Sequence, residues 1–224
     1  MYIIYFLAIV IIPIVAQLKV KGAYSKYSKV PSSSRMPGYQ VARQILDSHG
    51  LYDVTVHQVS GTLSDHYDPR NKTVNLSTDV YNGHSVAATA VAAHEVGHAI
   101  QHAQSYPFLE MRSKLVPVAN FGSNFSWILI MVGFLLGSQG FVLSGIIFML
   151  GAVLFQLVTL PVEFNASSRA MDEVVSLGII RNDEERETKK VLNAAALTYV
   201  AAAAVAVMEL LRLVLIYTGM NRDE

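Results

Sequence analysis

Residues 90–103 read AVAAHEVGHAIQHA and contain the pattern H-E-x-x-H, spelled HEVGH, within a run of helical composition. Residues four positions apart lie on one face of an α-helix. His94 and His98 can therefore direct two imidazoles at one Zn²⁺, with Glu95 beside the metal to take a proton from water. The pattern predicts a catalytic zinc site carried by a helix.

The alternative explanation of the motif is a surface helix that carries two histidines by chance. Its neighbours argue against this alternative, because they are apolar: Ala92, Ala93, Val96, Ala99 and Ile100. Imidazoles among apolar residues need a partner, and a metal ion is one. A glycine in mid-helix costs about 1 kcal/mol relative to alanine, so Gly97 indicates that another segment packs closely there.

Four apolar stretches dominate the rest of the chain: residues 2–16, 118–137, 141–160 and 194–217. A bilayer core requires about 20 apolar residues per helix, so the last three stretches qualify by length. The first qualifies if it extends to Val20, with Lys19 and Lys21 reaching the interface. It lacks a preceding basic segment and a small-residue cleavage site, so we expect a signal anchor in place of a cleaved signal peptide.

Composition limits the classes of function. Apolar residues make up 52% of the 224 residues, and the mean hydropathy is +0.37. Lys+Arg and Asp+Glu are equal at 17 each, so no net charge favours nucleic acid as a partner. The sequence has no cysteine, which excludes disulfides, cysteine-ligated zinc and a thiol nucleophile.

The distribution of positive charge predicts the orientation of the spans. Ten Lys and Arg residues fall within 17–116 and five within 161–193, whereas the turn around Ser138 has none. With four crossings, the two charged segments lie on one side, which the positive-inside rule makes cytoplasmic. We therefore expect the HEVGH motif on the cytoplasmic side and both termini outside.

Several shorter elements are predicted between the spans. Residues 21–37 are typical of a surface segment, 39–48 of a helix capped by Gly50, and 53–59 of a strand. Residues 62–67 and 72–76 flank the turn sequence DPRN, which indicates a hairpin. We expect Ser85 to cap the HEVGH helix. We expect Pro161 to break the third span, with a new helix over 163–176 that ends at Gly178. The fourth helix should begin at Asn182.

A catalytic zinc site uses three protein ligands and leaves one position open. His102 lies about 12 Å along the helix axis from His94, which is too far for one ion. Glu163 is the better candidate, because two spans return the chain to the same side of the membrane just before it. The competing acids are Glu110, Asp172 and Glu173.

The segment Asp65 to Asp68 has two interpretations. In the functional one, a hairpin strand faces the substrate, and His66 or Tyr67 stabilises the oxyanion. In the structural one, the Asp and His side chains satisfy their own turn. For His66 we favour the structural interpretation, because turns commonly use such residues.

Together these elements predict a mostly α-helical membrane protein with four transmembrane helices and a small α+β, zincin-like portion that carries the HEVGH helix. We expect one integrated domain of five consecutive segments. They are the N-terminal anchor (1–20), the α+β portion (21–116), a hairpin of two spans (117–160), the third-ligand helix with its connection (161–193), and the last span with its tail (194–224).

Several motifs together resemble the YugP family of neutral zinc metallopeptidases, which are bacterial membrane proteins of similar length. The matching runs are DHYDP at 65–69, AVAAHEVGHAIQHA at 90–103, RSKLVPVAN at 112–120 and EFNASSRA at 163–170. The resemblance implies His94, His98 and Glu163 as ligands of one zinc ion and Glu95 as the catalytic residue. It also implies a bacterial plasma membrane location.

A more distant similarity links the chain to HtpX and the CAAX prenyl proteases, gluzincins in which a later E-x-x-A-D supplies the third ligand. Residues 163–166 match that spacing, but Ser167 replaces the Asp. Another side chain must then support a ligand histidine. The candidates are Asn165, Ser167 and Arg169.

The predicted function is a zinc endopeptidase that cleaves membrane-proximal or unfolded protein segments, with peptide substrates and the lipid bilayer as its partners. The first rival is a non-catalytic membrane scaffold stabilised by zinc, against which the intact Glu95 argues. The second rival is an intramembrane site-2-type protease. The polar flanks of the HEVGH helix and the absence of an Asp-Gly ligand motif within a later span argue against it.

Overall fold

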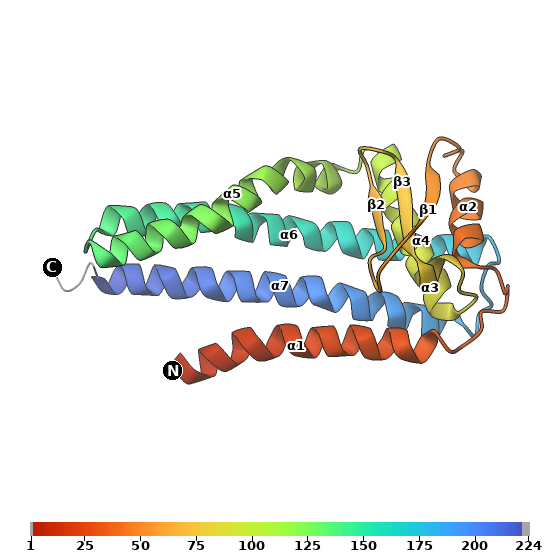
Figure 1. The fold of residues 1–224 in the computed structure, drawn as a ribbon, viewed down its shortest axis with the longest axis horizontal. Helices are drawn as coiled ribbons and strands as arrows, with labels where there is room; N and C mark the ends of the chain where they lie inside the picture. The colour runs from red at the N-terminus through yellow and green to blue at the C-terminus, as the bar shows by residue number, and fades with distance from the viewer. Residues whose placement is uncertain (1, 221–224) are drawn as a thin grey trace. The chain divides into compact units, whose positions relative to one another are not determined.

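The computed structural model describes residues 2–220 of the chain (Figure 1). The chain divides into two compact units. The first, the helix unit, comprises the described parts of Met1–Ile14, Pro107–Pro161 and Tyr199–Glu224. The second, the sheet unit, comprises Val15–Tyr106 and Val162–Thr198. The HEVGH motif and Glu163 therefore belong to one unit.

Four described helices are long and apolar enough to cross a membrane. They are α1 (Tyr2–Tyr27), α5 (Pro107–Leu135), α6 (Gln139–Ser176) and α7 (Glu185–Met220). In the most apolar window of each helix, at most 22% of the residues are buried inside the protein. Large apolar side chains such as Phe121 and Leu135 are exposed, as expected for helices surrounded by lipid. The prediction of a mostly α-helical, four-span membrane fold is confirmed.

Small residues let α5 and α6 approach closely within the helix unit. A Cβ atom added to Gly122 of α5 would lie 2.6 Å from the carbonyl oxygen of Phe148 on α6, which is closer than real Cβ atoms come. Membrane helices associate through such close backbone contacts, because lipid offers no hydrophobic drive to pair them.

Pro161 does not break the third span, so that prediction is wrong. One continuous helix, α6, runs through the proline to Ser176. The physical reason lies in the residues that follow, because a stripe at helical spacing is fully buried or nearly so: Val162, Ala166, Ala170 and Val174. Burial of this stripe in the sheet unit outweighs the single backbone hydrogen bond that proline cannot donate.

Two other boundaries also differ from the prediction. Helix α1 continues to Tyr27, where residues 21–37 suggested a surface segment, because Tyr27 is 3% exposed and packs into the core of the sheet unit. Helix α7 begins at Glu185 and not at Asn182. The buried Glu184 carboxylate accepts hydrogen bonds from the Ser33 and Arg181 amides, which holds the preceding residues in a turn.

The sheet unit contains three short strands, β1 (Thr55–Val59), β2 (His66–Asp68) and β3 (Thr73–Ser77), in the order β1-β3-β2. Strands β2 and β3 are antiparallel, with Asp68 opposite Thr73, which confirms the predicted hairpin. Strand β1 pairs parallel to β3. Strand β2 therefore forms one edge of the sheet.

Three helices complete the sheet unit beside these strands: α2 (Gly38–Ser48), α3 (Thr78–Tyr81) and α4 (Val86–Ala103) (Figure 1). The predicted cap of α4 is confirmed, because the Ser85 hydroxyl accepts a hydrogen bond from the Ala88 amide. Helix α4 contributes apolar residues from Val86 to Ile100 to the core, and α2 packs against it. The HEVGH helix is thus a central element of the core of the sheet unit.

Candidate metal centre

Helix α4 places the two histidines of the motif side by side. Their ring centroids lie 4.8 Å apart, with the rings nearly perpendicular. The His98 and His94 side chains are only 10% and 12% exposed. The spacing of one helical turn, predicted from the sequence, therefore brings two imidazoles to one buried point.

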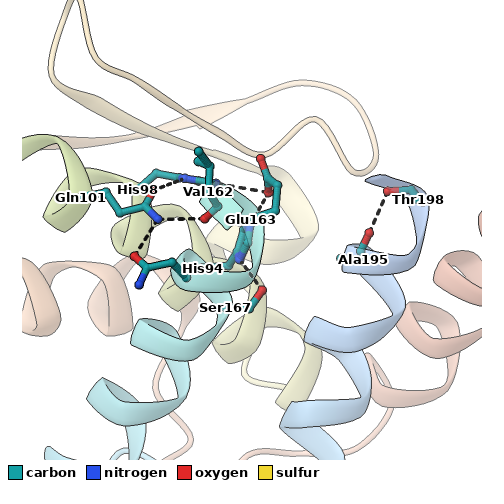
Figure 2. Close-up of polar contacts among 9 residues, drawn as sticks. His94, His98, Gln101, Val162, Glu163, Ser167, Ala195 and Thr198 are labelled. Atoms are coloured by element: carbon teal, nitrogen blue, oxygen red, sulfur yellow. Dashed lines mark hydrogen bonds and ion pairs between the residues drawn. The ribbon is translucent and has the colours of Figure 1, made fainter. Parts of the chain in front are cut away.

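Helix α6 brings Glu163 to the same point from a position far along the chain (Figure 2). Its Oε2 atom lies 3.3 Å from His94 Nε2 and 3.5 Å from His98 Nε2, and the side chain is 2% exposed. In a tetrahedral zinc site with bonds of about 2.0–2.1 Å, ligand atoms lie about 3.3–3.4 Å apart. The spacing and chemistry of these three donors fit a zinc ion.

Among residues 2–220, this is the one group of His and acidic side chains arranged to hold a metal. The alternatives weighed from the sequence lie elsewhere. Glu173 pairs with His49 at 2.8 Å, Glu110 is exposed in the first turn of α5, and His102 Nδ1 contacts the Tyr67 hydroxyl.

The close approach of α4 and α6 depends on Gly97. A Cβ atom added there would lie 2.6 Å from the carbonyl oxygen of Ala166. Because that neighbour is backbone, a larger residue would push α6 away from α4. The absence of a side chain at Gly97 thus sets the distance at which Glu163 meets the histidines, in agreement with the packing inferred from the sequence.

Glu95 lies on α4 between the two histidines and is 8% exposed. Burial raises the pKa of Glu95 to about 7, opposed by the nearby His94 and assisted by the carboxylates of Glu163 and Asp65. A carboxyl with a pKa near neutrality is suited to accept a proton and to return it.

Each histidine also has a neighbour on the ring nitrogen that faces away from Glu163. His98 Nδ1 lies 3.0 Å from the Gln101 side-chain oxygen, and His94 Nδ1 lies 3.3 Å from the Ser167 hydroxyl. The side-chain oxygen of Asn165 accepts hydrogen bonds from Gln101 and from Arg169, so these two candidates lie one step away from the histidines. Gln101 belongs to the polar flank of the HEVGH helix, and its amide three residues after His98 was the only signal of this contact in the sequence.

The two residues considered for the oxyanion lie on edge strand β2. His66 is exposed, and its ring contacts the Ser64 carbonyl and the Asn75 side chain. The Tyr67 hydroxyl lies 2.8 Å from His102 Nδ1 on α4. Burial raises the pKa of Tyr67 to about 12, so its hydroxyl keeps its proton at neutral pH.

Comparison with known proteins agrees with this arrangement. A family model described as "Putative neutral zinc metallopeptidase" matches residues 2–218. A curated relative, "Putative membrane protease YugP" from Bacillus subtilis (strain 168), is 54% identical over 209 residues, which cover 93% of this chain and 92% of the relative. No solved structure was found to match.

Proposed function

This chain belongs to the neutral zinc metallopeptidase family whose model it matches, and from that membership we propose that it is a membrane-embedded, zinc-dependent endopeptidase. One observation carries the proposal. Two imidazoles and a carboxylate converge in the interior of the sheet unit, with the buried Glu95 beside them.

One zinc ion per chain would be held by Nε2 of His94, Nε2 of His98 and Oε2 of Glu163. Two histidines and a glutamate form the ligand set of thermolysin-like enzymes, in which a fourth position stays open. When bound, zinc polarises the scissile carbonyl and makes water a stronger nucleophile at neutral pH. The chain has no cysteine that would favour a closed, structural site.

Glu95 is the proposed general base. Its carboxylate takes a proton from the attacking water and then passes it to the leaving amine, so that one group serves both halves of peptide hydrolysis. Its burial supports this role, because a protein interior excludes competing bulk water.

Edge strand β2 is the proposed docking site of the substrate. An extended peptide can add to a sheet edge through backbone hydrogen bonds, a common mode of peptide recognition. Such a mode requires an unfolded or extended segment. It therefore favours membrane-proximal or unfolded substrates over folded proteins, with Tyr67 as a proposed contact near the reacting carbonyl.

A peptidase assay tests the proposal directly. Purified, zinc-loaded protein in detergent should cleave unfolded protein, and a zinc chelator should abolish cleavage, because the proposed chemistry requires the ion. Restoring zinc should restore the activity, whereas restoring Mg²⁺ should not, since Mg²⁺ prefers oxygen ligands. Cleavage that survives complete removal of zinc would contradict the proposal.

We also propose that the metal centre faces the cytoplasm, because the segments 17–116 and 161–193 carry most of the positive charge. Single cysteines introduced at the exposed Asn71 and Asp183 should resist a membrane-impermeant thiol reagent in intact cells. A cysteine at Ser138, between α5 and α6, should react. The sequence contains no native cysteine that would interfere.

All three cysteines should react after the cells are permeabilised, which controls for accessibility within the protein. Labelling of Asn71→Cys and Asp183→Cys in intact cells, with protection of Ser138→Cys, would reverse the assigned orientation.

A further inference from the structure

We infer that Gln101 is a positioning residue that fixes the tautomer of His98, so that the lone pair of His98 Nε2 faces Glu163. The inference rests on the proposed zinc site and concerns how one of its ligands is held. Gln101 lies on α4 one turn after His98 and is fully buried. Its side-chain amide contacts the His98 ring on one side and α6 on the other (Figure 2).

The first step concerns which way round the Gln101 amide lies. One end of the amide faces the backbone carbonyl of Val162 at 2.8 Å. A carbonyl oxygen can only accept a hydrogen bond, so the amide nitrogen of Gln101 must face it. The amide oxygen therefore faces His98 Nδ1, at 3.0 Å. The opposite orientation would bring two buried oxygens together without a proton between them.

A second contact independently supports this orientation of the Gln101 amide. The Gln101 nitrogen also lies 2.9 Å from Asn165 Oδ1. Asn165 is itself oriented by Arg169, whose Nε lies 2.7 Å from the same oxygen. A guanidinium can only donate, so the atom of Asn165 that faces Gln101 is an acceptor. The nitrogen of Gln101 again points to α6.

The third step follows for His98. Since the Gln101 oxygen can only accept, His98 Nδ1 must carry the proton of the neutral imidazole. The lone pair then lies on Nε2, the atom 3.5 Å from Glu163 Oε2. His94 is held differently, because the Ser167 hydroxyl at 3.3 Å can either donate or accept. The network therefore determines the tautomer of one ligand histidine and leaves the other adjustable.

Zinc affinity tests this role. Gln101→Met keeps the length of the side chain but removes the acceptor, so His98 loses the partner that selects its tautomer. We expect zinc binding, measured by competition with a chromophoric chelator, to weaken about 10–100-fold, as for other residues that orient metal ligands. The matched control is Gln58→Met, the same change at an exposed residue of β1 that donates to the Thr78 hydroxyl and lies outside this network, and it should bind zinc like the wild type.

A second measurement uses the wild type alone and does not depend on a variant that folds. In zinc-free protein with ¹⁵N-labelled histidine, at a pH where the ring is neutral, the imidazole proton of His98 should reside on Nδ1 and should exchange slowly with water, because it is buried. The metal-free protein is used because zinc bound to Nε2 would by itself place the proton on Nδ1. A proton on Nε2 of His98 would overturn the inference. So would a folded Gln101→Met variant, with an unchanged circular dichroism spectrum, that binds zinc as tightly as the wild type.

Both measurements are made without a substrate, so they judge Gln101 separately from the peptidase proposal. A protein that shows the expected Nδ1 proton and the expected loss of affinity, yet cleaves no peptide, would support the role of Gln101 and contradict the proposed function. A protein that cleaves peptides but carries the His98 proton on Nε2 would support the proposed function and contradict the role of Gln101.

Discussion

Replacing Glu95 with Gln should reduce peptidase activity by about 10²–10⁴-fold, the usual cost of losing a general base. The amide has nearly the same size and shape as the carboxyl group but cannot accept the proton of the attacking water. Because Glu95 is not one of the three proposed zinc ligands, its replacement should leave one zinc per chain. The test compares initial rates of peptide cleavage with zinc content and thermal unfolding for the same preparations.

Glu110→Gln is the matched control. Glu110 is an exposed residue in the first turn of α5, so this variant makes the same change in charge and side chain away from the metal centre. It should retain full activity. A Glu95→Gln protein that cleaves peptides at the wild-type rate would rule out the proposed mechanism, because Glu95 is the one residue proposed to accept the proton of the attacking water.

The choice of substrate affects how a negative result is read. If the zinc-loaded wild type cleaves none of a broad set of unfolded peptides, the alternative function as a zinc-stabilised scaffold becomes the better explanation. That alternative predicts that Glu95→Gln has no effect on growth or on the protein's partners, because a structural zinc site makes no use of a proton acceptor.

The parts of the fold that the sequence predicted well are those determined by local rules. The spacing of His94 and His98 follows from helix geometry alone, and Ser85 caps α4 through a contact three residues away. The hairpin around residues 68–71 depends on turn-forming residues within it. Such features involve neighbours in the sequence, so a single chain contains the information needed to predict them.

Pro161 shows where a local rule fails. The residue is a reliable helix breaker when nothing else holds the chain. Here Val162, Ala166 and Val174 are fully buried, and the helix that presents them on one face continues through the proline. The sequence contained this stripe, but its burial depends on α4, whose Gly97 meets Ala166 from a position 69 residues earlier in the chain.

Gln101 illustrates the same limit within the metal centre. The sequence pointed to Glu163, because two spans return the chain to one side of the membrane. It could not show which side chain holds His98, since the Val162 carbonyl that orients the Gln101 amide is 61 residues away in the sequence. Ser167, Asn165 and Arg169 were identified as candidates from a neighbouring motif, yet only Ser167 touches a histidine directly.

Glu163→Ala should remove zinc and, with it, the peptidase activity. The carboxylate is the only negatively charged donor of the three, and it lies within 3.5 Å of both imidazoles. Its loss leaves two neutral donors on one side of the site. We expect zinc affinity to fall by more than the roughly 10–100-fold that follows loss of a residue that merely orients a ligand. Elemental analysis should give about one zinc per chain in the wild type and almost none in the variant.

Glu173→Ala provides a demanding control, because Glu173 lies on the same helix and also pairs with a histidine, His49, at 2.8 Å. It removes a carboxylate–histidine pair from the sheet unit without touching the metal centre, so it should keep its zinc and its activity even if its stability falls. If Glu163→Ala retained both wild-type zinc content and activity, the third ligand would have to be another residue. If Glu173→Ala instead lost the zinc, the competing assignment from the sequence would be the correct one.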